Sequence, residues 1–246
     1  MTADTIQTDS LEIHNGDLAI AAYYARPNHS APVPGVVVIQ EIFGVNAHIR
    51  DVTERFAQAG YAAIAPAIYQ RLAPGFEAGY TPEDITIGRE YKHQTQADEL
   101  LGDIQAALDF LKAQPGVKPG GYGCIGFCFG GHVAYLAATL ADIAATASFY
   151  GAGITTLTPG GGSPTVTRTA AIKGTLHAFF GEEDASIPPE QVEQIAAALQ
   201  QHGIPHAVHR YPRAGHGFFC DRRADYHPEA AADAWQRVLQ LFSSCL

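Results

Sequence analysis

Cys128 lies at the centre of the segment Gly126-Phe127-Cys128-Phe129-Gly130-Gly131, between a predicted strand and a predicted helix. The segment fits the pattern G-x-nucleophile-x-G, with cysteine in the position of the more common serine. Small residues are required two positions before and after the nucleophile, because side chains there would collide with the crossing backbone. The start of the helix would lower the pKa of the thiol and offer a free backbone N–H to an oxyanion. The pattern therefore predicts a cysteine nucleophile at the carboxyl end of a sheet.

The same segment allows two other interpretations, a glycine-rich turn around a buried cysteine and half of a phosphate-binding loop. A phosphate loop would continue into Lys-Ser or Lys-Thr, and this segment does not. A dinucleotide-binding turn would follow the first strand, whereas this segment lies midway along the chain. The interpretation as a buried cysteine stays open at this point.

A candidate acid and a candidate base follow the nucleophile, each just after a predicted strand. Asp184 comes first, and His216 is the one of eleven histidines that has glycine on both sides. The order nucleophile, acid, histidine is that of the α/β-hydrolases. Asp184 would hold His216 in the required tautomer, and His216 would pair with Cys128. The neighbouring Glu182 and Glu183 compete with Asp184 for the role of the acid.

Strands and helices alternate along most of the chain. The expected strands are a hairpin over 11–24, turning at Asn15–Gly16, and residues 35–40, 61–68, 123–127, 143–150, 175–180 and 206–211. The expected helices are residues 46–59, 94–114, 132–140, 189–202 and 229–242. This alternation predicts parallel strands joined by right-handed crossovers. We therefore expect an α/β fold in one domain, residues 1–246, with a mostly parallel central sheet, helices on both faces and an N-terminal β-hairpin.

Two segments interrupt this alternation. Residues 70–93 contain prolines, glycines and scattered charges, and residues 151–171 are rich in glycine and threonine. Both compositions are typical of loops. We expect both segments to be irregular loops near the active site, where they would widen a substrate pocket.

The composition excludes several classes of partner. The chain has 246 residues and a formal net charge of −10, from 15 basic and 25 acidic side chains. An acidic chain without a cluster of lysine and arginine is a poor partner for nucleic acid or for an anionic membrane. No stretch approaches the roughly 20 apolar residues of a membrane span. We therefore expect a small-molecule substrate, with neither nucleic acid nor a membrane as partner.

The N-terminus and the cysteines indicate a reduced, cytoplasmic protein. Met1–Ser10 is polar and acidic, without the positively charged start and apolar core of a signal peptide. The four cysteines, Cys124, Cys128, Cys220 and Cys245, are too few and too scattered for a disulfide framework. Cys124 and Cys128 fall on a strand and a turn, and no C-x-x-C pair is present. We therefore expect neither a metal site nor a cofactor.

Five segments together resemble the dienelactone hydrolase family, the cysteine branch of the α/β-hydrolase fold. They are residues 40–44, 126–131, 148–151, 181–188 and 215–218, in the same order along the chain. The resemblance implies an α/β-hydrolase fold and a hydrolase that cleaves a lactone or carboxylic ester through a cysteine thioester. It also makes dienelactone the expected substrate and favours a monomer.

The resemblance assigns roles to residues that spacing alone would not single out. It implies that Glu41 lies close to the nucleophile and takes the thiol proton when substrate binds. A carboxylate at the end of a buried strand is costly unless it is paired or functional, and the alternative is that Glu41 faces water. The resemblance also implies an oxyanion hole from the backbone N–H groups of Ile42 and Phe129. Tyr150 and Phe43, in two of the matching segments, are expected to contact substrate.

The segment after His216 departs from the family pattern. Family members that act on dienelactones hold the substrate carboxylate with arginines, one of them four residues after the catalytic histidine, where this chain has Cys220. Arg89 and Arg222 are the candidate replacements, with solvated surface arginines as the alternative. Two other functions stay open: hydrolysis of a different small ester or lactone, and oxidant sensing by Cys128 without catalysis.

Overall fold

The computed structural model describes residues 6–29 and 31–246. The strands are β1 Ile6–Asn15, β2 Leu18–Pro27, β3 Gly35–Ile39, β4 Ala62–Pro66, β5 Tyr122–Phe127, β6 Ile143–Phe149, β7 Thr175–Gly181 and β8 His206–Tyr211. The helices are α1 Ala47–Gln58, α2 Pro82–Gln94, α3 Ala97–Ala113, α4 Phe129–Ala137, the 3-10 helix η1 Thr165–Ala171, α5 Pro189–Gln201 and α6 Pro228–Cys245. Half of the N-terminal segment that is expected to carry no signal peptide, residues 1–5, lies outside the described residues.

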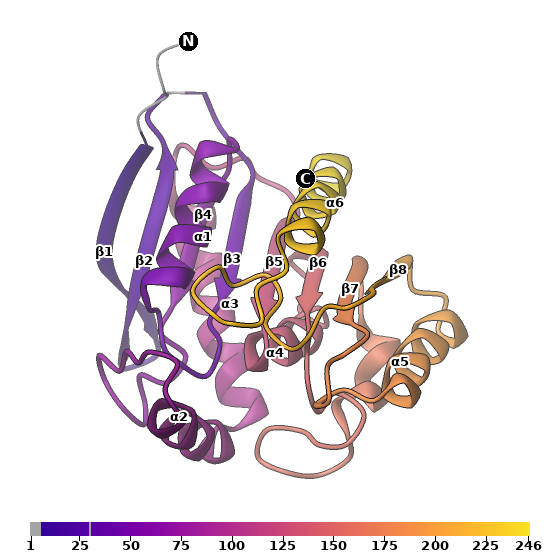
Figure 1. Cartoon of the computed structure of the whole chain (residues 1–246). Coiled ribbons are helices and arrows are strands. Elements are labelled where there is room, and N and C mark those ends of the chain that lie inside the picture. Colours follow the sequence, from indigo (N-terminus) through magenta and orange to yellow (C-terminus); the bar gives the residue numbers. More distant parts are fainter. Residues whose placement is uncertain (1–5, 30) are drawn as a thin grey trace.

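The strands form one eight-stranded sheet in the order β1-β2-β4-β3-β5-β6-β7-β8 (Figure 1). β1 pairs with β2 and β2 with β4 in antiparallel orientation, and the other pairs of neighbouring strands are parallel. The hairpin turns at Gly16 and Asp17, one residue later than expected, because Asn15 still pairs with Leu18. The predicted α/β fold with a mostly parallel sheet and an N-terminal hairpin is confirmed.

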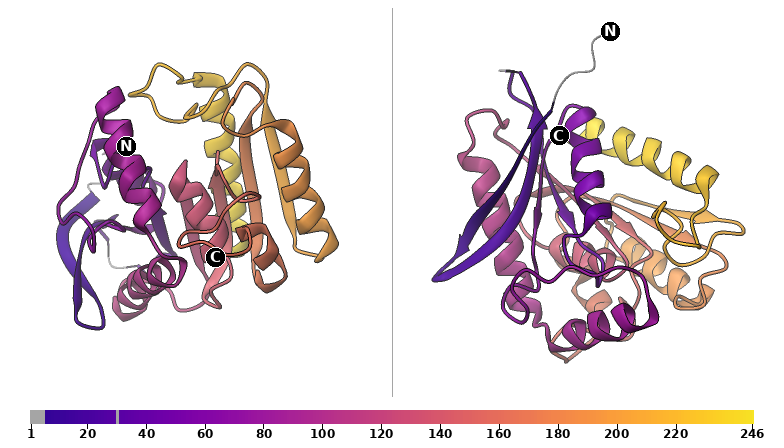
Figure 2. Two further views of the ribbon diagram at one scale, coloured as in Figure 1. Left: turned by 90° about the horizontal axis from the view of Figure 1, so that it is seen from below. Right: turned by 60° about the vertical axis from the view of Figure 1, so that its left-hand side comes forward.

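Helices cover both faces of the sheet, as expected. α1 and α6 lie on one face, and α3 and α4 lie on the other (Figure 2). β3 shows why this sequence suits such a position, since all five of its residues are buried. Val36 and Val38 pack into the core that includes α1 and α6, whereas Val37 and Ile39 pack into the core that includes α3. A strand buried on both faces has no polar side to alternate with, so its sequence is a continuous apolar run.

The segments after the parallel strands carry the chemically interesting side chains. Glu41 follows β3, Cys128 follows β5, Asp184 follows β7 and His216 follows β8. Because these strands are parallel, their carboxyl ends all lie on the same side of the molecule, at the bottom of Figure 1. Open α/β sheets bind ligands at the carboxyl ends of their strands.

The expectation of irregular loops is wrong for parts of both segments. Within residues 70–93, a helix begins at Pro82, with Thr81 and Asp84 forming a capping box. Periodicity gave no sign of this helix because Gly88 is its one buried residue, so it has no apolar stripe. Within residues 151–171, η1 occupies the last seven residues. The domain boundaries 1–246 stay a prediction.

Helix α4 also begins earlier than expected. The sequence predicts a start at His132, whereas the structure continues the helix back to Phe129, directly after Cys128. Gly130 and Gly131 disfavour a helix by intrinsic propensity, but close packing against neighbouring backbone requires them there. Among the residues that the structure describes, no helix is long and apolar enough to cross a membrane.

Candidate active site

Cys128 occupies a strained turn between β5 and α4. Its backbone has φ of 55° and ψ of −116°, a conformation that costs a non-glycine residue about 1–3 kcal/mol. A Cβ on Gly126 would lie 1.9 Å from the carbonyl oxygen of Gly130, and a Cβ on Gly130 would lie 2.3 Å from that of Gln40. Both glycines are therefore required for close approach, as the sequence pattern predicted. The turn leaves the Cys128 side chain partly exposed.

Cys128, His216 and Asp184 form a hydrogen-bonded triad. His216 Nε2 lies 3.0 Å from Cys128 Sγ, and His216 Nδ1 lies 2.7 Å from Asp184 Oδ2. The second carboxylate oxygen of Asp184 accepts a hydrogen bond from the backbone N–H of Ser186 at 2.8 Å. These contacts hold the imidazole between an acid and a nucleophile, which is the arrangement that acyl transfer by a thiol requires.

Burial distinguishes Asp184 from its two competitors for the role of the acid. Asp184 is buried, whereas Glu182 and Glu183 are exposed. Burial lowers the pKa of His216, but the Cys128 sulfur and the Asp184 carboxylate outweigh burial and raise that pKa to about 10. The raised pKa makes the His216 imidazole a stronger proton acceptor than a free histidine.

The backbone expected to form the oxyanion hole is fixed by two helices. Phe129 is the first residue of α4, so its N–H has no acceptor within the helix. Ile42 follows Glu41 in the turn after β3, and α2 packs directly on it. A Cβ on Gly88 of α2 would lie 2.4 Å from the Ile42 carbonyl oxygen, so only glycine allows this approach. The helix that the sequence did not reveal therefore supports the turn that carries Ile42.

Glu41 is fully buried, which rules out the alternative that it faces water. Its Oε1 accepts a hydrogen bond from Arg223 Nη1 at 3.1 Å. Its Oε2 has no hydrogen-bond partner among the residues that the structure describes. Burial raises the pKa of Glu41, and the charges of Arg223 and His216 oppose this effect. Glu41 is therefore a paired but incompletely hydrogen-bonded carboxylate.

Arg223 is the buried cation that sequence reasoning missed. Its guanidinium carbon lies 6.0 Å from the centre of the Phe43 ring and 5.8 Å from that of Tyr80. Gly217 has φ of +88°, and a Cβ there would lie 2.7 Å from Arg223 Nη1. The glycine after the histidine therefore leaves room for the guanidinium that neutralises Glu41.

Comparison with known proteins identifies the family. The sequence model of the dienelactone hydrolase family matches residues 20–246. The chain belongs to the dienelactone hydrolase family. The "Putative carboxymethylenebutenolidase" of Synechocystis sp. is 57% identical over 244 residues, which cover 99% of each chain. As a member of this family the protein is a hydrolase, as expected.

Further relatives agree in sequence and in structure. The "Carboxymethylenebutenolidase" of Pseudomonas putida is 30% identical over 216 residues, which cover 87% of this chain and 86% of that protein. The crystal structure of a "Putative Dienelactone Hydrolase" from Klebsiella pneumoniae is similar with a TM-score of 0.88 at 32% identity. The similarity covers 97% of this chain and 99% of that chain, and the expected α/β-hydrolase fold is confirmed.

In this dienelactone hydrolase family member, two of the four residues expected to contact substrate are buried and two are exposed. Tyr150 is fully buried, and its ring centre lies 5.2 Å from that of His216. Phe43 is buried beside Arg223. Arg89 is exposed on α2, and Arg222 is exposed after β8. A buried Glu41 indicates a buried cation beside it, but no sequence signal distinguishes Arg223 from the adjacent Arg222.

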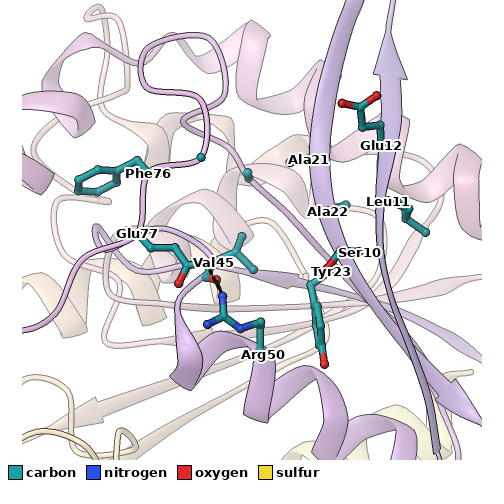
Figure 3. A pocket seen from close by; sticks show the side chains of 12 residues that line it. Ser10, Leu11, Glu12, Ala21, Ala22, Tyr23, Val45, Arg50, Phe76 and Glu77 are labelled. Atoms are coloured by element: carbon teal, nitrogen blue, oxygen red, sulfur yellow. Dashed lines mark hydrogen bonds and ion pairs between the residues drawn. The ribbon is translucent and has the colours of Figure 1, made fainter.

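A surface cavity of about 350 Å³ lies away from the triad residues, between the β1–β2 hairpin and the segment around Phe76 (Figure 3). Arg50 lies at its edge, where Nη1 donates to the carbonyl oxygen of Val45 at 2.6 Å and pairs with Glu77. The side chains that line this cavity include neither a cysteine nor a histidine. The candidate chemistry therefore belongs to the triad and not to this cavity.

Proposed function

We propose that the protein hydrolyses a small lactone or carboxylic ester by covalent catalysis through Cys128. The observation that carries this proposal is the continuous Cys128–His216–Asp184 triad, with Cys128 at a strained turn, at the carboxyl ends of the parallel strands. The curated relatives are named as carboxymethylenebutenolidases, which favours a dienelactone as the substrate. A different small ester or lactone is the alternative.

In the first half of the reaction, the Cys128 thiolate attacks the substrate carbonyl carbon. The backbone N–H groups of Ile42 and Phe129 would stabilise the negative charge that develops on the carbonyl oxygen. The C–O bond of the ester then breaks, and the leaving oxygen takes up the proton that the Cys128 thiol released. A lactone ring opens in this step and stays attached to sulfur as a thioester. An enol leaving group is activated enough for attack by a thiolate.

In the second half, His216 accepts a proton from water, and the hydroxide attacks the thioester carbonyl carbon. The sulfur of a thioester carries no charge, so the contribution of the thiolate to the raised pKa of His216 disappears. His216 is then more easily deprotonated and can act as a base. Asp184 stabilises the imidazolium that forms. The C–S bond breaks, which releases the acid and restores Cys128.

We further propose that Arg223, in place of the exposed Arg89 and Arg222, binds a carboxylate of the substrate. Arg223 and Glu41 are 14% and 1% exposed as side chains, so their pairing is shielded from solvent. A substrate carboxylate could form a similar charge-assisted pair with the guanidinium. Glu41 would then lose its partner and become a stronger acceptor for the Cys128 proton. Phe43 lies beside the guanidinium and would form part of the wall of this subsite.

Hydrolysis of a dienelactone at pH 7, followed by absorbance, tests this proposal. We expect turnover by the parent and by Cys124→Ala, which removes a fully buried thiol of β5. Cys128→Ala should show no turnover above the uncatalysed rate. Acid quenching of the parent should give the protein plus one intact ring-opened substrate by mass spectrometry, located on Cys128.

Three outcomes distinguish mechanism from substrate. Unchanged turnover by Cys128→Ala would overturn the proposed mechanism. Cys128-dependent hydrolysis of an activated phenyl ester, without dienelactone turnover, would keep the mechanism and reject the substrate. Oxidation of Cys128 by peroxide that is independent of His216, without any hydrolysis, would support the thiol sensor instead.

Three expectations from the sequence stay predictions. They are a monomeric state, a cytoplasmic location and the absence of a cofactor. The triad needs no second chain to complete it, since its three side chains come from one chain, and this supports the monomer.

A further inference from the structure

Glu41, His48 and Cys220 form a buried cluster beside the triad, called here the Glu41 cluster. The three side chains are fully buried, and one potential ligand atom from each lies within 4.8 Å of the other two. The residues come from the turn after β3, from α1 and from the segment after β8. Their distance in the sequence explains why no short metal-binding motif indicates them.

Several polar atoms of this cluster have no hydrogen-bond partner. Among the described residues, none bonds to Nδ1 or Nε2 of His48 or to Oε2 of Glu41. An unpartnered buried polar group costs about 1–3 kcal/mol. The His48 ring makes edge-on contacts with the rings of Phe127 and Phe219, at centroid distances of 5.8 and 6.4 Å. These atoms are positioned for a ligand that the protein itself does not supply.

We propose that the Glu41 cluster binds a divalent transition-metal ion of the zinc class. A carboxylate oxygen, an imidazole nitrogen and a thiolate are the ligand set that Zn²⁺ and Co²⁺ prefer, whereas Mg²⁺ and Ca²⁺ prefer oxygen alone. The thiol of Cys220 would bind as the thiolate and release its proton to solvent. A water molecule would complete a tetrahedral site.

The surroundings fit such an ion. Arg223 bonds to Oε1 of Glu41, which leaves Oε2 for the metal. The two anionic ligands balance the charge of the ion, which limits its repulsion by Arg223. The Cys220 thiol donates a hydrogen bond to Tyr80 Oη at 3.3 Å, and this hydroxyl lies at the edge of the site. His48 and Tyr80 also line an open cavity of about 370 Å³, through which an ion could reach the cluster.

Metal binding should inhibit hydrolysis. An ion on Oε2 would hold Glu41 in the cluster and remove it as the acceptor of the thiol proton. This consequence rests on the proposed role of Glu41 in activating Cys128, whereas the binding of the metal does not. The two are therefore tested separately.

Titration of the Cys128→Ala protein with Co²⁺ under reducing conditions tests the binding. This background removes the catalytic thiol as a competing ligand. We expect one equivalent of Co²⁺ to give the near-ultraviolet absorption of a thiolate–cobalt bond and to raise the unfolding temperature. Added Cys220→Ala should abolish the absorption, and His48→Phe should weaken binding by more than about 100-fold. Added Cys124→Ala, which removes an equally buried thiol, should change neither.

The proposal fails if the Cys128→Ala protein gives no thiolate–cobalt absorption, or if Cys220→Ala leaves it unchanged. A water-filled polar cavity would give the first of these results. Inhibition of the parent and of His48→Phe by Zn²⁺ then tests the role of Glu41. Weaker inhibition of His48→Phe supports that role. Equal inhibition of both proteins, with cobalt binding as expected, would show that Zn²⁺ inhibits at the Cys128 thiol; it would overturn inhibition through Glu41 and leave the metal site standing.

Discussion

The triad and the Glu41 cluster both lie near the carboxyl ends of the parallel strands, but they differ in how completely they are hydrogen-bonded. In the triad, both nitrogens of His216 and both carboxylate oxygens of Asp184 have partners. In the Glu41 cluster, one carboxylate oxygen and both nitrogens of His48 have none among the described residues. Asp184 and Glu41 are both buried, so access to bulk water does not explain why one carboxylate is fully hydrogen-bonded and the other is not.

This difference separates two kinds of polar site. A fully bonded group of side chains has one arrangement, and that arrangement is ready for the reaction before substrate arrives. A group with unpartnered buried atoms pays a cost in the free energy of folding, which a ligand or a movement can relieve. We therefore expect substitutions in the triad to affect the chemical step and substitutions around Glu41 to affect ligand binding.

The largest effect is expected from the acid of the triad. Asp184→Asn should lower kcat on the order of 10³-fold, because the amide no longer holds His216 in the required tautomer. The matched control is Glu183→Gln, one residue away and exposed, which should leave kcat unchanged. Steady-state kinetics with an activated ester measure both. Equal losses in the two variants would show that Asp184 acts only through charge.

The next effect tests the support of the oxyanion hole. A Cβ on Gly88 would collide with the Ile42 carbonyl oxygen, so Gly88→Ala should displace Ile42 and lower kcat about 10²-fold. Gly116→Ala is the control, because a Cβ there meets no atom within 4 Å. Without such a collision, alanine within α2 would stabilise the helix by up to about 1 kcal/mol. Unchanged kcat with increased stability would contradict the proposed role of α2.

A smaller effect distinguishes Arg223 from its exposed neighbour. Arg223→Gln should raise KM for a dienelactone about 30-fold, as expected for loss of a charge-assisted pair, and leave KM for a neutral ester unchanged. Arg222→Gln should change neither constant. Glutamine keeps a donor for Glu41, which limits structural damage. A rise in KM that is equal for both substrates would make Arg223 a structural residue only.

The smallest effect compares two buried histidines. His132 bonds to the Ala152 carbonyl oxygen at 3.1 Å and to Thr165 Oγ1 at 2.7 Å, whereas His48 has no partner among the described residues. At pH 7 and with a chelator present, His132→Phe should lower the free energy of unfolding by about 2 kcal/mol. His48→Phe should leave it unchanged or raise it, because the substitution removes two buried nitrogens that have no partner among the described residues. Urea denaturation measures both, and equal losses would show that His48 has a partner.

The same two variants should differ from the parent in pH dependence. Burial lowers the pKa of both histidines to about 4, with other charges and hydrogen bonds as smaller influences. The unfolded chain therefore binds protons that the folded chain does not, and stability is lost as the pH falls from about 6.5 to about 4. Each substitution removes one of these two histidines, so the stability of each variant should fall less steeply over this pH range than that of the parent.

The fold could largely be predicted because its signals are local and periodic. The continuous apolar run of β3 indicates burial on both faces, and the structure buries every residue of that strand. Periodicity does not predict helix α2 because its exposed surface has no apolar period, and the capping box of Thr81 and Asp84 is its local signal. The start of α4 was missed because glycines required by packing have a low helix propensity.

The candidate site likewise has features that the sequence predicts and features that it does not. By itself, the sequence determined the turn around Cys128 and the order of Asp184 and His216, because the sterics of a turn and the order of elements are properties of the chain. Only the tertiary structure decided that Arg223 pairs with Glu41 and that Cys220 lies beside it. Such partners come from segments about 180 residues apart, and the free energy of a buried charge depends on whatever the fold places next to it.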